Sequence, residues 1–167
     1  MAALKNKIDF ALVFSVKNAN IPRTTLDGYG ELSDVCLKRK IRNRLQDAGE
    51  NIFVQSDDYR KDEYRSLRSR AEAVLGKAMK NESELHELAN KTWIDVRSFG
   101  QVFGFKGGDA KGVSVGIRGP VTVQPAFSLD PINVTSLQIT KSVSGEGDGT
   151  KRGSDTMGMK HSVDFGV

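Results

Sequence analysis

The pattern of hydrophobic and polar residues predicts a strand, a helix and a second strand in the first third of the chain. Residues 8–16 (IDFALVFSV) are almost all apolar and rich in β-branched and aromatic side chains, as in a strand covered on both faces. Residues 33–46 carry apolar side chains at helical spacing, and residues 51–56 (NIFVQS) form a short apolar run. This order predicts a βαβ unit in which residues 8–16 are a central strand.

The predicted helix at residues 33–46 has one apolar stripe and is otherwise basic. Leu37, Ile41 and Leu45 recur on one face, so we expect them to be buried against a sheet. The polar side chains fall on two flanks, with Lys38, Arg39, Arg42, Asn43 and Gln46 on one and Lys40 and Arg44 on the other. Such a face is either a solvated surface or a surface for a polyanion such as nucleic acid.

Residues 57–112 are predicted to be a largely helical insertion. Residues 57–80 are highly charged but carry apolar side chains at helical spacing, which predicts a surface helix. A second helix is expected to start near Ser83, and residues 93–103 trace another apolar helical stripe. Trp93 is in register with that stripe, which favours a core anchor over a base-stacking platform.

Seven of the 17 glycines lie in residues 100–119. Residues 104–112 lack the Gly-Lys-Ser or Gly-Lys-Thr ending of a Walker A motif, which argues against nucleotide triphosphate binding. Two interpretations remain open. The segment is either a flexible connection or a loop whose bare backbone approaches a sugar-phosphate chain, with Lys106 and Lys111 adding charge.

The remaining apolar segments predict further strands. Residues 17–32, with a proline and two glycines, read as an ordered loop or a short edge hairpin in which Arg23 can reach a phosphate. Residues 113–127 alternate as a strand with a bend, and residues 162–167 alternate as a further strand.

A long hairpin is predicted at residues 130–160. A β-prone arm at residues 134–140 is followed by a glycine- and charge-rich tip and a returning arm that contains Met157 and Met159. A two-stranded ribbon of this length cannot bury itself, and methionine is an adaptable apolar side chain, so we expect a partner surface here.

Composition narrows the class of protein. With 167 residues and 38% hydrophobic content we expect one domain, and the net charge of +4 is compatible with a polyanionic partner. One cysteine and two histidines exclude an internal disulfide and provide no structural metal site, and no cofactor is expected. No catalytic triad is visible, and no signal segment or membrane-spanning run is present, so we expect a cytoplasmic binding protein and not an enzyme.

The basic string SDVCLKRKIRN resembles the start of the first helix in the backbone subunit of type I-C CRISPR interference (Cascade) complexes, a member of the RAMP superfamily. Three other stretches agree with this resemblance: IDFALVFSV, GPVTVQPAFSLDPINVTSLQIT and DTMGMKHSVDFGV. The loop after the first stretch is shorter than is usual in that family. Family members also continue beyond the position of Val167, so we expect the domain to be incomplete at its C-terminus.

The resemblance implies an α+β fold: a single ferredoxin-like or RRM-like antiparallel sheet with helical insertions, in which residues 130–160 are a thumb-like hairpin. It implies a subunit that polymerises along the CRISPR guide RNA and presents it for pairing with the target DNA strand. The expected partners are the guide RNA, the target strand, neighbouring copies and other subunits of the complex, with no membrane.

The expected RNA-binding residues are Arg23, Lys38, Arg39, Lys40, Arg42, Asn43, Lys106, Lys111, Met157 and Met159. Two other classes stay open. One is a metal-dependent RNA-cleaving member of the same superfamily, for which Asp27 is the only acidic residue in the loop after the first strand. The other is a basic protein-interaction module.

Overall fold

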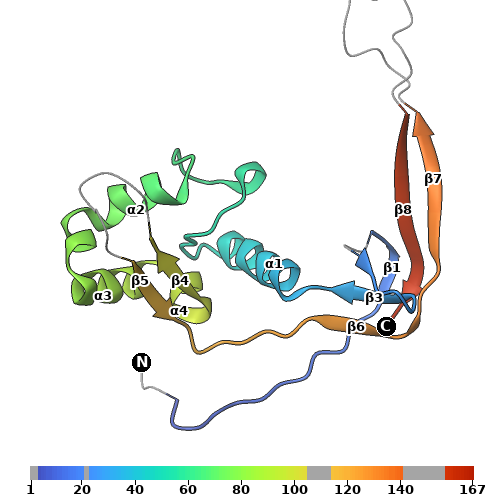
Figure 1. Ribbon diagram of the computed structural model, residues 1–167, viewed down its shortest axis with the longest axis horizontal. Helices are drawn as coiled ribbons and strands as arrows, with labels where there is room; N and C mark the ends of the chain where they lie inside the picture. The colour runs from blue at the N-terminus through green and yellow to red at the C-terminus, as the bar shows by residue number, and fades with distance from the viewer. Residues whose placement is uncertain (1–3, 21–22, 105–113, 141–156) are drawn as a thin grey trace, which may run out of the picture. The chain divides into compact units, whose positions relative to one another are not determined.

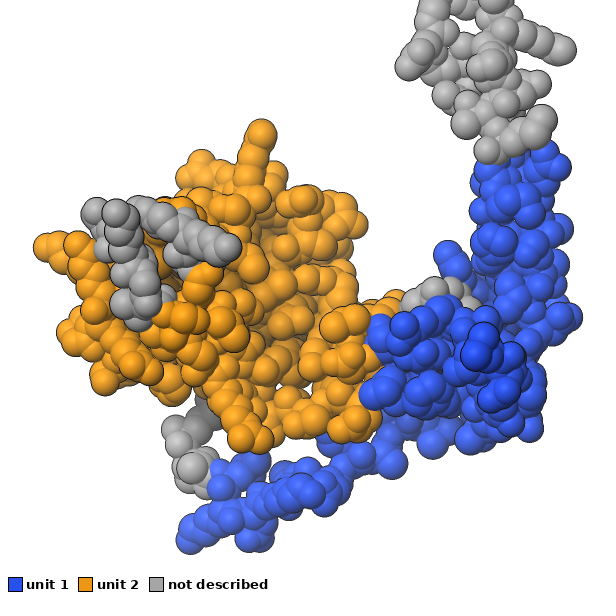
Figure 2. Space-filling view, viewed as in Figure 1, with its two compact units in different colours: residues 1–33, 125–167 blue, residues 34–124 orange. Residues whose placement is uncertain are grey.

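A computed structural model describes residues 4–20, 23–104, 114–140 and 157–167. The chain forms two compact units (Figure 2). Unit 1 contains both ends of the chain, Met1–Ser33 and Pro125–Val167, and unit 2 is the continuous segment Asp34–Gln124. Helices and antiparallel strands are both present, so the α+β class is confirmed. The expectation of a single domain stays a prediction.

Unit 1 consists of two three-stranded antiparallel sheets (Figure 1). The first has the order β1-β8-β7, with β1 Val16–Ala19, β8 Met157–Gly166 and β7 Val134–Thr140. The second has the order β2-β3-β6, with β2 Arg23–Thr24, β3 Tyr29–Leu32 and β6 Ala126–Pro131. The pairing of β2 with β3 confirms the predicted short hairpin within residues 17–32.

The long hairpin is also confirmed in its described arms. β7 and β8 pair without a break from Val134 opposite Val163 to Thr140 opposite Met157. The expected separate strand at residues 162–167 is the continuation of β8. The predicted tip, at residues 141–156, lies outside the described residues.

The predicted central strand at residues 8–16 is wrong for most of its length. Only Val16–Ala19 pairs with β8, and the side chains of Ile8, Phe10 and Val13 are 65%, 70% and 77% exposed. A strand exists only where a second strand satisfies its N–H and C=O groups. The apolar pattern of residues 8–16 indicates that another surface can bury these side chains, but it does not identify that surface.

Unit 2, where the structure describes it, combines helices with a β-hairpin that packs against α3 and α4. The helices are α1 Asp34–Asp47, α2 Leu67–Leu75, α3 Glu82–Thr92 and α4 Ile94–Phe99, with short 3-10 helices η1 Asp57–Tyr59 and η2 Gly76–Lys80. The hairpin joins β4 Gly100–Phe103 to β5 Val115–Arg118. The rings of Phe53, Trp93 and Phe103 meet in the core, with 4.6 Å between the centroids of Phe53 and Trp93. Trp93 is therefore confirmed as a core anchor.

Several predicted boundaries in unit 2 are wrong. Residues 51–56 are not a strand, so the βαβ unit does not form. Residues 57–80 contain two short 3-10 helices and α2 instead of one long helix, and residues 93–103 divide into α4 and β4. The predicted strand at residues 113–127 divides into β5 and the start of β6. Glycines explain two of these breaks, because Gly76 and Gly100 have φ of +48° and +81°, outside the helical region.

The strands that the structure describes belong to three small antiparallel sheets. The predicted single ferredoxin-like or RRM-like sheet is therefore not confirmed. No helix in the described part of the chain is long and apolar enough to cross a membrane.

Candidate nucleic-acid interface

The basic helix α1 turns its polar flank inward, opposite to the prediction. Gln46 is 3% exposed and the side chain of Arg42 is 12% exposed, whereas Ile41 on the predicted buried stripe is 37% exposed. Leu37 and Leu45 are only half-buried. Apolar spacing located the helix correctly, but its orientation is determined by the polar partners that unit 2 offers.

The main partner is Asp95, a fully buried carboxylate on α4. Its Oδ2 accepts a hydrogen bond from Arg42 Nε at 3.0 Å, and Arg42 also lies over the Phe99 ring, 5.2 Å from its centroid. The same carboxylate accepts the backbone N–H groups of Phe53 at 2.8 Å and Val54 at 3.1 Å. Buried charge is tolerated only when it is paired and hydrogen-bonded, as it is here.

The carbonyl groups of the same two residues are bound by arginines. Arg39 Nη1 donates to Val54 O at 2.7 Å, and Arg70 Nη1 donates to Phe53 O at 2.8 Å. Burial, followed by the nearby positive charge of Arg42, lowers the pKa of Arg39 from its usual value. Side chains from α1, α2 and α4 therefore satisfy all four backbone polar groups of residues 53 and 54. This is why a strand-like sequence here needs no neighbouring strand.

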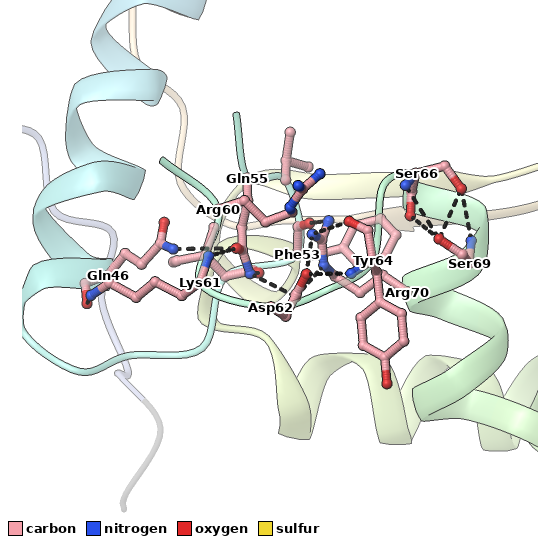
Figure 3. Close-up of polar contacts among 12 residues, drawn as sticks. Gln46, Phe53, Gln55, Arg60, Lys61, Asp62, Tyr64, Ser66, Ser69 and Arg70 are labelled. Carbon is pink, nitrogen blue, oxygen red and sulfur yellow. Dashed lines mark hydrogen bonds and ion pairs between the residues drawn. The ribbon is translucent and has the colours of Figure 1, made fainter. Parts of the chain in front are cut away.

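The loop that follows is held by a second polar cluster (Figure 3). Asp62 accepts two hydrogen bonds from Arg70, from Nε at 2.7 Å and from Nη2 at 2.8 Å, and these hydrogen bonds hold the pKa of the Asp62 carboxyl below its usual range. Gln55 donates to Asp62 at 3.2 Å and accepts from Gln46 at 3.3 Å. Lys61 Nζ donates to Gln46 O at 2.6 Å, so the loop is tied to the C-terminal half of α1.

The cations of α1 therefore divide into two groups. Arg39 and Arg42 have internal partners, and their role in RNA binding stays a prediction. Lys40 and Arg44 are exposed, and within the part of the chain that the structure describes neither has an ion-pair partner. Lys38 pairs with Asp34 at 3.0 Å, and this hydrogen bond lowers the pKa of Asp34.

Lys38 also lines an open groove of about 570 Å³ beside the β4–β5 hairpin. The groove is formed by the end of α4, both strands and the segment after β5; its lining residues are Lys38, Phe99, Gly100, Gln101, Val102, Gly116, Ile117, Arg118, Gly119, Val121 and Thr122. Two of them are cationic and none is acidic. A groove of this composition has a positive potential suited to a phosphate chain.

The other predicted RNA-binding residues lie in several places. Asn43 is half-buried on α1, and its Oδ1 is buried without a hydrogen bond within the described structure. In unit 1, Arg23 forms an ion pair with Glu31, Met159 is 57% exposed, and Met157 is the first residue of β8. The predicted RNA-binding residues Lys106 and Lys111 lie outside the described residues.

Asp95, Arg70 and Arg118 were missed by sequence reasoning. Asp95 did carry a signal, because it is a single acidic residue within the apolar run Trp93-Ile-Asp-Val96, where a carboxylate must be paired if it is buried. Arg70 lies in a mixed-charge segment where no spacing distinguishes it from its neighbours. Within the described residues, no group of three histidine, cysteine or acidic side chains could hold a metal ion.

Comparison with known proteins identifies the family. The sequence model of the family described as CRISPR-associated protein Cas7 matches residues 6–167. A search of curated proteins finds no match. Cas7 proteins have an RNA-binding backbone role in CRISPR interference and associate with CRISPR RNA and other Cascade subunits. Because the match covers nearly the whole sequence, the chain belongs to the Cas7 family of CRISPR-associated proteins.

Proposed function

We propose that this Cas7 protein is the backbone subunit of a type I-C interference complex, acts in the cytoplasm, polymerises along the guide RNA and presents it to the target DNA strand. The observation that carries the proposal is the distribution of positive charge in unit 2. Lys40 and Arg44 project from α1, and Lys38 and Arg118 line a groove without an acidic residue. The strings SDVCLKRKIRN and DTMGMKHSVDFGV support the type I-C assignment.

The chemistry of this surface suits a reader of the RNA backbone. Lysine and arginine neutralise phosphates without distinguishing bases, as a subunit that accepts any guide sequence requires. Sequence-specific RNA readers instead stack bases on exposed aromatic rings. Among the described residues of unit 2 the exposed aromatic side chain is Tyr59, and its hydroxyl donates a hydrogen bond to Asp47.

The β7–β8 hairpin supports polymerisation. Leu137 and Ile139 are both more than half exposed on the same face of this ribbon. Two strands cannot bury such side chains by themselves, so a further surface must cover them in the working protein. In the proposed assembly that surface is the next copy along the guide RNA.

The first experiment measures RNA binding and assembly in the intact protein. Purified protein is incubated with a guide RNA, and its mass is recorded by native mass spectrometry with and without the RNA. We expect RNA-dependent species that contain several copies. Absence of both RNA binding and higher-order species would contradict the proposal.

The second experiment tests the charge distribution. Replacing Lys40 and Arg44 together with alanine should weaken binding of single-stranded RNA and lower the slope of log affinity against log salt by about 1.4, or about 0.7 per phosphate contact. Lys77→Ala with Lys80→Ala removes the same charge from η2 and is the control. Incubation of the RNA with and without a divalent metal ion checks the binder assignment, because metal-dependent cleavage would contradict it.

A further inference from the structure

We propose that the outer face of the β4–β5 hairpin is a seat for the sugar-phosphate backbone of single-stranded RNA, with Arg118 and Lys38 binding phosphates and Gly116 leaving the strand bare for close approach. The inference rests on the proposed RNA-binding function and specifies where in unit 2 the strand lies. It assigns a role to Gly116 and Arg118, which no motif in the sequence indicates.

The register of the hairpin defines its two faces. Gln101 is opposite Ile117 and Phe103 is opposite Val115, and this face carries the buried side chains Phe103, Val115 and Ile117. Residues directly opposite each other share a face, and alternate residues point to opposite faces. The outer face therefore consists of Gly100 opposite Arg118 and Val102 opposite Gly116. Two of its four positions have no side chain.

Gly116 differs from the other glycines of this region. A Cβ at Gly100 would lie 2.4 Å from Ile117 O, and one at Gly119 would lie 2.2 Å from Ser98 O, so the fold itself requires glycine at both positions. A Cβ at Gly116 would have no atom within 4 Å, and Gly116 does not have a positive φ. Neither packing nor backbone conformation requires glycine there.

Glycine inside a strand nevertheless weakens it, because it loses more conformational freedom than other residues and packs no side chain. A strand glycine with no internal cause is typical of a site where a ligand or another backbone approaches closely. The face beside Gly116 opens into the groove lined by Lys38 and Arg118. The bare backbone of Gly116 and the positive charges of Lys38 and Arg118 therefore lie on the same groove.

The charges and apolar groups of the groove specify the class of ligand. Within the described residues Arg118 has no ion-pair partner, and Lys38 shares its charge with Asp34 alone. Val102 and Val121 are exposed on the groove lining, where they can contact ribose or the edge of a base without selecting a sequence. Cations separated by small apolar groups suit a single strand bound through its backbone.

The test uses Gly116→Leu in the full chain, because a Cβ at this position meets no atom within 4 Å and the larger side chain should occupy the groove. Binding of a fluorescent single-stranded RNA of arbitrary sequence is measured by anisotropy at several salt concentrations, with thermal unfolding measured alongside. We expect Gly116→Leu to keep the wild-type Tm and to reduce RNA affinity at least tenfold. Gly116→Ala, with a smaller side chain, should reduce affinity less.

Arg118→Ala removes a positive charge from the groove and leaves Gly116 in place. Its result therefore does not depend on whether the Gly116 variants fold. We expect it to lower affinity and to reduce the salt slope by about 0.7, as for one lost phosphate contact. Lys91→Ala, which removes an exposed cation at the end of α3 outside the groove, is the matched control and should leave both quantities unchanged. A folded Gly116→Leu protein and an Arg118→Ala protein that both bind RNA as the wild type does would overturn the inference.

Different results would contradict the proposed RNA-binding function and the proposed binding site on the β4–β5 hairpin. If the wild-type protein binds no RNA, the proposed function fails and the seat fails with it. If the wild-type protein binds RNA and only the Lys40 and Arg44 double variant loses affinity, the function stands and the groove is not the seat. If Gly116→Leu changes assembly with other subunits but not RNA affinity, the hairpin face is a protein contact and the inference is wrong.

Discussion

Asp95 is a buried carboxylate that joins three separate parts of unit 2. It is fully buried, it pairs with Arg42, and it binds the backbone N–H groups of Phe53 and Val54. Its charge is compensated inside the protein rather than by water. Replacing the carboxylate with an amide leaves the buried Arg42 guanidinium without a counter-charge and puts an NH2 group in place of one of the two accepting oxygens, which costs far more than removing a surface ion pair.

Asp95→Asn should therefore lower the free energy of unfolding by about 3 kcal/mol or more, as is usual when one partner of a buried pair is lost. Glu72→Gln, which breaks the exposed pair with Arg68 on α2, should cost less than about 1 kcal/mol. Urea denaturation of the full chain followed by tryptophan fluorescence reports on this, because Trp93 lies in the core of unit 2. Equal losses for the two variants would show that the Asp95 contacts contribute little.

Asp62 predicts a dependence of stability on pH. Its pKa is held below the usual range, chiefly by hydrogen bonds from Arg70, so the unfolded chain takes up a proton at higher pH than the folded chain does. The stabilisation is present above the unfolded pKa of about 4 and is lost as the pH falls through the lower folded pKa.

Asp62→Asn removes this titration. Between pH 5 and about pH 3, the wild-type Tm should fall more steeply than the Tm of the variant, whereas at pH 7 the variant should be the less stable protein. Thermal unfolding monitored by circular dichroism across this range checks both statements. Parallel pH profiles for the two proteins would contradict the assignment of acid sensitivity to Asp62.

At the scale of single elements, α1 shows which part of the fold was accessible from sequence. Spacing located the helix to within one or two residues, because helical periodicity is a local property. Its orientation was not accessible, because the partners of Arg39 and Arg42 come from residues 54 and 95. The same argument applies to residues 51–56, where distant charged side chains satisfy the backbone groups of Phe53 and Val54.

The orientation of α1 makes a prediction that reverses the one drawn from its apolar stripe. Arg42→Ala should cost about 3 kcal/mol, because it leaves Asp95 buried and unpaired. Ile41→Ala should cost less than about 1 kcal/mol, as expected for a side chain that already contacts water. The urea midpoints of the two variants distinguish the two orientations of α1. A larger loss of stability for Ile41→Ala would support the orientation predicted from the apolar stripe.

Sequence also predicted the hairpins better than the sheets. The arms of β7 and β8 are adjacent in the chain apart from their tip, so turn signals and alternation suffice to pair them. β3 instead pairs with β6, which lies about a hundred residues later, as in Tyr29 opposite Pro131. No local pattern encodes that partnership. The candidate site was found only in part for the same reason, since Lys38 and Arg118 come together through tertiary structure.

At the scale of the whole molecule, the exposed β7–β8 ribbon and the positive surface of unit 2 predict that assembly and RNA binding can be separated. The ribbon carries Leu137 and Ile139 on one face, with Ile139 opposite Gly158. In the proposed assembly, contact between copies covers these side chains, whereas α1 and the groove bind phosphates. A variant of one surface should leave the other intact.

Leu137→Asp with Ile139→Asp should accordingly reduce the RNA-dependent formation of multi-copy species while a single copy still binds RNA. Charged residues would replace apolar ones at the contact, and desolvating them is unfavourable. Native mass spectrometry measures the species, and thermal unfolding confirms the fold. Leu26→Asp, a fully exposed position in the turn between β2 and β3, is the matched control. Wild-type assembly by the double variant would place the contact between copies elsewhere.

The construction of unit 1 from both ends of the chain has a consequence for biosynthesis. The ribosome completes residues 34–124 before it makes β6, β7 and β8, so β1 leaves the exit tunnel without β8, and β3 leaves it paired at most with β2 and without β6. At about 5–20 residues per second the delay is roughly 5–20 s. During this time the unpaired edge of β3 is open to other nascent chains, as are the apolar side chains from Ile8 to Val13, which stay exposed in the folded chain. Unit 2 can fold as it emerges, but the sheets of unit 1 can form in full only after β6, β7 and β8 are made, and a chaperone that binds extended apolar segments would act on residues 8–13 first.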